Sequence, residues 1–392
     1  MTLSPTDALD LARELATQFA TRADEADRLG KLPAEDIRAL RASDYPALSI
    51  PRAYGGSDLP LRTCVEAQLE LAQGSGSTAL VAAMQMQVFG NARLNRPWSE
   101  DLYERLCRIV VEEGALFNSV ASEPEIGSPS RGQFFATTAT KNDDGYCING
   151  RKTWSTGGRP LTHLLVGATL DDQPASLLVE ADRPGIEWVE TWGDGLSMRA
   201  ADNHDVYFRD TQVPAQNLLG QRPSPHKKAQ PWAPMIFASV YLGIGLAARD
   251  AVVRYALERV PKALGKAIAT LPKIQRLIGE VDMALMAAKA LLLEVAEEEE
   301  HASLARLAAA KQHAVEVANE VTDKAIRIAG AAGVSRALPL ERYLRDTRAG
   351  HMHPPNGDAA LEAVGKGAIA EIEQEGQAEG VDIRTFSPDN TQ

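Results

Sequence analysis

A pair of histidines lies beside a forced break in the chain, in the segment "RDTRAGHMHPPNGDAALEAVGKG" at residues 345–367. His351 and His353 come just before Pro354–Pro355, and a new helical pattern begins after the prolines. Imidazole is the side chain that changes charge near neutral pH, so two histidines beside a chain break are candidates for an active-site corner. The alternative is a structural histidine that caps the turn before the next helix.

Carboxylates near these histidines do not form a metal-binding pattern. Asp346 and Asp358 flank the pair, but neither stands at a recognisable ligand spacing, so no metal site is predicted. The acidic run Glu297–Glu300 is interpreted as a solvated helix end, because successive helical positions point in different directions.

Two further segments offer groups that could bind a cofactor. In "RKTWSTGG" (151–158), the ring of Trp154 could cover a planar cofactor, while Ser155 and Thr156 supply hydroxyl and backbone N–H groups. In "ASEPEIGSPSRG" (121–132), Ser122 and exposed backbone groups could bind a heteroaromatic edge or a phosphate. The structural alternatives are an aromatic side chain packed on a sheet and an inter-domain turn.

The segment "GIGLAA" (243–248) formally fits the dinucleotide-binding pattern G-x-G-x-x-A. That pattern needs a preceding strand and βαβ alternation, whereas only long helical patterns follow here. Small residues that let two helices pack closely are the better explanation.

The composition predicts a soluble cytoplasmic protein. The chain has 392 residues and a net charge of −12, which argues against a general affinity for nucleic acid or an anionic membrane. Its three cysteines are widely spaced and never form a CxxC pair, which favours reduced thiols over a disulfide framework. We identify no signal peptide and no stretch that reaches the roughly 18 apolar residues of a membrane span.

These candidate residues must be positioned by three successive parts of the chain. Residues 1–116 show helical periodicity, residues 117–225 alternate as strands do, and residues 226–380 return to long amphipathic helices, before a loose tail at 381–392. Within the β region, Asn142–Gly145 and Asn149–Gly150 are predicted turns. The predicted fold is α+β, with an N-terminal helical domain, a central β-barrel or sandwich, and a C-terminal four-helix bundle.

Taken in order, several motifs resemble the acyl-CoA dehydrogenase family. "IPRAYGG" (50–56) resembles its first loop motif, "ASEPEIGS" (121–128) its T-E-P-x-x-G-S loop, and "RKTWSTGG" its K-x-W-I-T-N-G strand. "DVYFRDTQVPAQNLLG" (205–220) resembles the end of the family's β domain, and "RIAGAAGVSRALPLERYLRD" (327–346) resembles its G-G-x-G and R-D segments. The resemblance covers about residues 30–370.

This resemblance implies a flavin between the β domain and the C-terminal helices, FAD in most of the family and FMN as the alternative. By position, Ala121 and Ser122 would meet the pyrimidine end of the ring, and Trp154 and Thr156 would cover it. Ser128 would contact the CoA portion of a thioester substrate. The family also implies an electron acceptor and a homodimer or homotetramer.

The departures from the family bear directly on the chemistry. The glutamate that removes the α-proton is replaced by Pro354, and the second family position for it falls near Ala233. An arginine that meets the flavin diphosphate is replaced by Pro261, and a following glutamine by Pro272, so FAD would lose charge-assisted contacts. We therefore name His353 and Asp358 as candidate catalytic residues.

Three functions fit this sequence. The leading prediction is a flavoprotein that dehydrogenates an acyl thioester or a similar hydrophobic compound. Arg345, Arg348, His353 and Pro355 also resemble the spacing in flavin monooxygenases of the same fold, which depend on a flavin reductase. The third is a flavin- or acyl-binding subunit without turnover.

Overall fold

The computed structural model of the protein describes residues 2–125, 134–221 and 230–378. The predicted substrate contact Ser128 lies outside the described residues.

The first part of the chain folds into helices. They are α1 (Pro5–Ala20), α2 (Ala23–Leu29), α3 (Ala34–Ala42), α4 (Leu61–Gly74), α5 (Gly76–Asn95) and α6 (Glu100–Glu113), with short 3-10 helices η1 (Tyr45–Ala47) and η2 (Arg52–Tyr54). Helix α1 begins with a capping box, in which the Ser4 side chain accepts from the backbone N–H of Asp7 and the Asp7 side chain accepts from that of Ser4. Its apolar face, with Leu15 and Phe19, is buried in the core.

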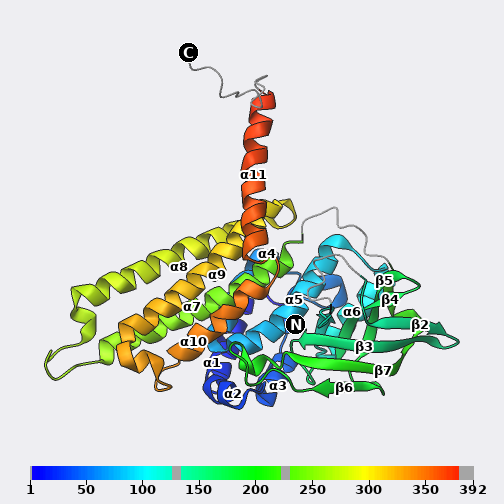
Figure 1. Ribbon diagram of the computed structural model, residues 1–392, viewed down its shortest axis with the longest axis horizontal. Helices are drawn as coiled ribbons and strands as arrows, with labels where there is room; N and C mark the ends of the chain where they lie inside the picture. Colours follow the sequence, from blue (N-terminus) through cyan, green and yellow to red (C-terminus); the bar gives the residue numbers. More distant parts are fainter. Residues whose placement is uncertain (1, 126–133, 222–229, 379–392) are drawn as a thin grey trace.

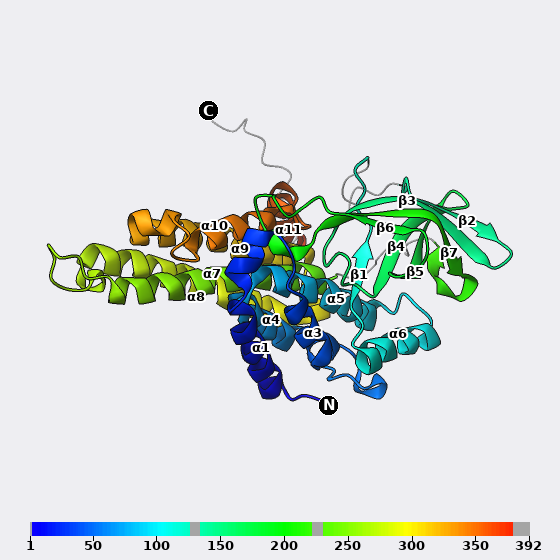
Figure 2. The same ribbon diagram turned by 90° about the horizontal axis from the view of Figure 1, so that it is seen from below.

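The middle of the chain forms one eight-stranded sheet (Figure 1). The strands are β1 (Phe117–Val120), β2 (Thr138–Asn142), β3 (Gly145–Ser155), β4 (His163–Leu170), β5 (Gln173–Glu180), β6 (Ile186–Val189), β7 (His204–Pro214) and β8 (Leu218–Gln221). Their order is β6-β7-β3-β2-β4-β5-β8, and β1 pairs in parallel with β4. The sheet lies beside α5 and α6, as the view from below in Figure 2 also shows.

One of the two predicted turns is correct. Asn142 pairs with Gly145 at the end of the β2–β3 hairpin. The second prediction is wrong, because Asn149–Gly150 lies inside β3, where the pairing with β7 shifts between Ile148 and Gly150. Gly150 has φ +153°, and a Cβ there would lie 2.6 Å from the Cα of Thr137, so a glycine is needed for a bulge and not for a turn.

The last part of the chain is again helical. It contains α7 (Trp232–Glu258), α8 (Pro272–Glu298), α9 (Leu304–Ala329), α10 (Leu340–Asp346) and α11 (Gly357–Ala378), with 3-10 helices that include η8 (Gly330–Val334) and η9 (Thr347–Met352). Helices α7, α8 and α9 lie side by side, whereas α11 extends away from the body of the molecule (Figure 1).

The glycines of "GIGLAA" serve helix packing, as predicted. They lie inside α7, where a Cβ on Gly243 would be 2.7 Å from both the Leu69 carbonyl oxygen and the Ala72 Cβ of α4. Gly245 faces Ala318 of α9. The small residues therefore let α7 approach α4 and α9 closely.

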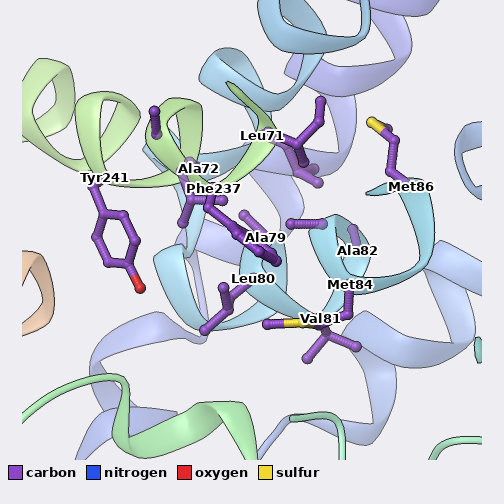
Figure 3. Packing of buried hydrophobic residues seen from close by; sticks show 14 of the residues in the cluster. Leu71, Ala72, Ala79, Leu80, Val81, Ala82, Met84, Met86, Phe237 and Tyr241 are labelled. Atoms are coloured by element: carbon purple, nitrogen blue, oxygen red, sulfur yellow. The ribbon is translucent and has the colours of Figure 1, made fainter. Parts of the chain in front are cut away.

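Helix α7 has a strongly apolar composition. By length and composition alone this helix could span a bilayer, but 72% of its most apolar window is buried inside the protein. Figure 3 shows the packing that explains this composition: Phe237 and Tyr241 of α7 meet Ala79 and Leu80 of α5. The apolar residues of α7 thus form the centre of the core.

Candidate functional site

The end of strand β3 presents an exposed tryptophan in an unusual backbone conformation. Trp154 has φ +55° and is 54% exposed, at a point where the β3–β7 pairing shifts between Lys152 and Ser155. A bulky residue in the left-handed region costs of order 1–3 kcal/mol, and such strain concentrates at functional sites. The arrangement turns a large aromatic ring outward.

The loop before residue 126 lies directly against this strand. The backbone N–H of Thr153 donates to the carbonyl oxygen of Ser122 at 3.0 Å, so Ser122 stays next to the residue that precedes Trp154. Ala121 and Ser122 are half-buried, and the Ser122 hydroxyl has no hydrogen-bond partner within the described part of the chain. A polar group beside an exposed ring can accept or donate to a bound ligand.

A fully buried ion pair lies beneath this loop. Lys152 Nζ is 2.6 Å from Glu123 Oε1, and both side chains are 0% exposed. The Glu123 carboxylate also accepts from the backbone N–H groups of Ala136 (2.6 Å) and Thr137 (2.9 Å). Burial alone raises the pKa of Glu123, but the hydrogen bonds from Lys152 and Thr137 hold it below its usual value. Burial lowers the pKa of Lys152 to about 8, against the opposing attraction of Glu123.

The two residues after Trp154 point inward. Ser155 and Thr156 are 1% and 4% exposed, so their side chains lie below the surface that carries the tryptophan. Asn118 Nδ2 donates to the Thr156 carbonyl oxygen at 2.9 Å. Ser155 Oγ and Asn118 Oδ1 are buried without a partner, which leaves unused hydrogen-bonding capacity behind the ring.

His353 contacts two aromatic residues of α7. Its Nε2 is 2.8 Å from the hydroxyl of Tyr241, and its ring stacks on Phe237 with centroids 4.6 Å apart. Burial lowers the pKa of His353 to about 4, and the nearby positive charge of Lys311 adds to this effect. The imidazole is therefore neutral at physiological pH.

Helix α9 holds the turn that carries His353. Lys311 Nζ, which is fully buried, donates to the carbonyl oxygen of Gly350 at 3.0 Å. Asn319 Nδ2 donates to the carbonyl oxygen of Thr347 at 3.2 Å. A Cβ on Gly350 would lie 2.9 Å from Val315 and 3.0 Å from the Tyr241 ring, so only glycine allows the turn to pack this closely.

One short segment of the β domain contacts both the end of the turn that carries Trp154 and the start of the segment that carries His353. Asp346, at the end of α10, accepts from the backbone N–H of Met198 at 2.8 Å. Three residues further on, the Ala201 carbonyl oxygen accepts from Gly157, at the end of the Trp154 turn, at 2.9 Å. Residues 198–201, which include η4 (Arg199–Ala201), thus join the segment that carries Trp154 to the segment that carries His353. Burial raises the pKa of Asp346 to about 6.

The remaining sequence candidates lie apart from this centre. Asp358 is exposed in the first turn of α11. His351 Nε2 is 3.2 Å from the side chain of Asn319, an internal contact of the turn. Arg345 pairs with Asp27 of α2 at 2.6 Å, while Arg348 is exposed. Arg345, one of the residues that resemble the monooxygenase spacing, therefore joins α10 to α2.

Several residues of this site were not identified from the sequence. Tyr241, Phe237 and Lys311 lie on long helices far from His353 along the chain, and nothing local marks them. Glu123 and Lys152 lie within the segments 121–132 and 151–158. The available signal was an acidic and a basic residue in two candidate ligand-binding segments.

The described residues contain no group of three side chains that could hold a metal ion. A groove of about 540 Å³ lies between α4 and α8, lined by Arg62, Ala290, Leu293, Glu294, Glu297 and Glu298. None of the residues around Trp154 or His353 that are named above lines that groove, so it does not belong to this site.

The residues around Trp154 fit a flavin. An exposed ring held in a strained conformation offers a flat apolar surface, and the unpartnered Ser122 hydroxyl lies on the neighbouring segment. The buried, unpartnered Ser155 Oγ behind the ring is a further polar group that the protein itself leaves unused.

Comparison with known proteins identifies the family of the chain. Family models match residues 6–105 (acyl-CoA dehydrogenase, N-terminal domain), 119–211 (middle domain) and 235–355 (C-terminal domain). YdbM of Bacillus subtilis (strain 168), named as an acyl-CoA dehydrogenase, is 34% identical over 88% of this chain and 92% of its own length.

Two solved structures have closely similar folds. FMN-bound TdsC from Paenibacillus sp. A11-2, a dibenzothiophene monooxygenase, has a TM-score of 0.84 and 26% identity over 93% of this chain and 98% of its own. Butyryl-CoA dehydrogenase from Megasphaera elsdenii has a TM-score of 0.83 and 25% identity over 94% of this chain and 99% of its own. The protein described here belongs to the acyl-CoA dehydrogenase family.

Proposed function

We propose that this protein is a flavin-dependent oxidoreductase that dehydrogenates a hydrophobic acyl thioester between its α and β carbons. The observation that carries this proposal is the exposed, left-handed Trp154 beside Ser122, joined through residues 198–201 to the turn that bears His353. Family membership supplies the reaction class. The glutamate that removes the α-proton in most of the family is absent here, so the residue that accepts this proton must be identified separately.

In this proposal Ala121, Ser122, Trp154 and Thr156 bind the flavin, FAD with FMN as the alternative. A bound flavin would accept the hydride from the β carbon. Trp154 covers the ring and excludes water from one side of it, while Ser122 binds its polar edge. Ser155 is proposed to contribute its Oγ, which is buried without a partner among the described residues. Ser128 is proposed to contact the substrate's CoA portion.

Two residues are proposed candidates for contact with the reacting carbons. His353 precedes Pro354, which replaces the family glutamate, and Asp358 follows at the start of α11. A carboxylate is the usual acceptor of an α-proton, and a neutral imidazole can also serve. Single variants His353→Ala and Asp358→Asn separate the two, because only the acceptor's loss should abolish the rate of substrate-dependent flavin reduction.

The test of the function is anaerobic reduction of the purified protein. After reconstitution with FAD or FMN, a panel of acyl-CoA thioesters of different chain length is added and flavin absorbance near 450 nm is followed. Bleaching by at least one thioester, and its loss in Trp154→Ala, is expected. A protein that binds flavin but is bleached by none of them would contradict the proposed dehydrogenation.

One observation favours a second candidate, a two-component flavin monooxygenase. No carboxylate replaces the family glutamate at position 354, and a neutral imidazole lies next to it, a group that can steady an oxygen species. The similarity to FMN-bound TdsC supports the same alternative. This enzyme would consume oxygen and substrate only when a flavin reductase supplies reduced flavin. The anaerobic assay contains neither oxygen nor a reductase, so a monooxygenase would not turn over in it.

We also propose a homodimer or homotetramer in the cytoplasm. Helix α11 leaves Leu361, Ile369 and Ile372 between 58% and 65% exposed, and α8 exposes Met283 and Met286 one turn apart. Apolar residues gathered on protruding helices are typical of a surface that another copy covers. Reduced cysteines agree with the proposed location.

A further inference from the structure

We infer that Tyr241 fixes His353 as a hydrogen-bond donor, with its proton on Nδ1, and that this N–H binds an acceptor oxygen of the substrate. This inference rests on the proposed function only in placing His353 at the substrate. It assigns Tyr241 as a positioning residue and gives His353 a role other than that of proton acceptor.

The first step concerns the tyrosine hydroxyl. Tyr241 is 0% exposed, so its O–H cannot be satisfied by bulk water. Within residues 2–125, 134–221 and 230–378, the only hydrogen-bond partner of this hydroxyl is His353 Nε2, at 2.8 Å. A buried donor without an acceptor is costly, so the O–H donates and Nε2 accepts.

The second step concerns the remaining proton of the imidazole. A neutral imidazole carries one N–H, and Nε2 uses its lone pair for Tyr241, so the proton is on Nδ1. Burial and the positive charge of Lys311 keep the ring neutral. Stacking on Phe237, at 4.6 Å between centroids, fixes the plane of the ring and therefore the direction of the Nδ1–H bond.

The third step concerns what Nδ1 meets. In the described part of the chain no acceptor lies within hydrogen-bonding distance of His353 Nδ1, and the residue is only partly buried. An N–H held in a fixed direction without an acceptor points to a ligand that supplies one. The shared chemistry is an oxygen that gains negative charge during the reaction, either a thioester carbonyl or a peroxide oxygen.

This assignment has a mechanistic consequence. In dehydrogenation, negative charge grows on the thioester carbonyl oxygen as the α-proton leaves, and a positioned N–H donor stabilises that charge. The lone pair that would accept the proton is already occupied by Tyr241. Removal of the α-proton therefore falls to a residue other than His353, while His353 binds the carbonyl.

The direct test is the protonation state of the ring, which needs no turnover. Nitrogen-15 NMR of protein labelled at histidine, with His353→Asn to assign the signal, is expected to show an N–H at Nδ1 and a hydrogen-bonded lone pair at Nε2. In Tyr241→Phe the Nε2 signal should lose its hydrogen-bond shift. A wild-type protein with the proton on Nε2 would overturn the inference, even if the proposed function holds.

A kinetic comparison tests the role without relying on the tyrosine variant, which could fold poorly. The amide of asparagine occupies the position of Nδ1, and that of glutamine the position of Nε2. His353→Asn should keep the rate within about tenfold, whereas His353→Gln should lose roughly 100-fold or more, the usual effect of one lost oxyanion donor. Anaerobic assays with acyl-CoA test whether His353 binds the thioester carbonyl. Assays with a flavin reductase and oxygen test whether it binds a peroxide oxygen.

The same kinetic comparison gives a different result if His353 is the proton acceptor. If His353 is the proton acceptor, both amide variants should be inactive, and Tyr241→Phe should react faster because the lone pair becomes available. Absence of wild-type activity in both assays would contradict the proposed function but not the tautomer, which the NMR measurement establishes independently.

Discussion

At the scale of single residues, the site combines a strained tryptophan with a neutral histidine. Trp154 adopts φ +55°, which disfavours a large side chain, yet its ring is largely exposed. Strain of this kind persists only where the surrounding structure imposes it. Here Thr153 is fixed to Ser122 and to Asp205, so the chain has little freedom to relax.

Trp154→Gly separates strain from function. Glycine adopts positive φ without penalty, so the apoprotein should be at least as stable as the wild type, with a gain of about 1 kcal/mol at most. Flavin affinity should fall at least tenfold because the covering ring is lost. Thermal unfolding of the apoprotein and fluorescence titration with flavin measure the two effects. Equal flavin affinity in the variant would show that the ring does not contact the cofactor.

His353 also makes an acid-dependent contribution to stability. Its pKa is lowered from 6.5 to about 4, so between these values the unfolded chain binds more protons. The contribution is present above pH 6.5 and is lost as the pH falls towards 4, by about 3 kcal/mol. The difference in unfolding free energy between wild type and His353→Asn should therefore shrink on acidification. A difference that is independent of pH would exclude this linkage.

At the scale of elements, a buried ion pair fixes strand β3 against the loop that carries Ser122. The Glu123 carboxylate accepts from Lys152 and from two backbone N–H groups just before β2. The Lys152 ammonium also lies 4.3 Å from the ring centre of Phe135. Three segments that are separate in sequence thereby share one buried charge network.

Removal of one partner should disturb both folding and cofactor binding. Lys152→Met leaves Glu123 buried without its counter-ion, which typically costs about 3–5 kcal/mol. Flavin affinity should fall as Ser122 and Trp154 lose their fixed spacing. The double variant Lys152→Met/Glu123→Gln should recover part of the stability. The exposed pair Arg38–Glu35 is the control, since Arg38→Ala should change stability by less than about 1 kcal/mol.

Close packing of α7 gives a matched pair of glycine variants. A Cβ on Gly243 would lie 2.7 Å from α4, so Gly243→Ala should destabilise the protein by about 1–3 kcal/mol. Gly279 in α8 has open space around it, so Gly279→Ala should stabilise by about 0.5–1 kcal/mol. Urea unfolding of both variants checks the sign of each change. A stabilising Gly243→Ala would show that α7 can move away from α4.

At the scale of the whole molecule, ion pairs join the first helices to the last ones. Arg345 of α10 binds Asp27 of α2 through its two terminal guanidinium nitrogens, at 3.0 and 2.6 Å, and also donates to the Leu196 carbonyl oxygen of the β domain. Arg342 pairs with Asp24 at 2.8 Å. These contacts hold together the three parts of the chain around residues 198–201, where the candidate site lies.

The protruding α11 allows a test of assembly. Replacement of Leu361, Ile369 and Ile372 by serine should leave the main body folded, because these side chains are exposed in one copy. If another copy covers them, light scattering should show a lower molar mass and the melting temperature should depend less on concentration. Triple replacement of exposed polar residues on the same helix is the control. An unchanged mass would place the interface elsewhere.

Much of this architecture was predictable because its signals are local. Periods of 3.6 and 2 residues located the helices and the strands, and the order of short motifs identified the family. Asn149–Gly150 was misread as a turn, because a glycine in a bulge and a glycine in a hairpin have the same sequence signal. The apolar composition of α7 was likewise compatible with a membrane and with a core, and only its burial distinguishes them.

The amino-acid sequence alone determined the family, the succession of helical and β regions, and the loss of the usual glutamate at Pro354. Only the tertiary structure decided which groups surround His353. Tyr241 lies 112 positions away along the chain, and Lys311 is on a different helix. Pairing of buried polar atoms depends on how helices pack and which atoms water cannot reach, and no local pattern of residues contains that information.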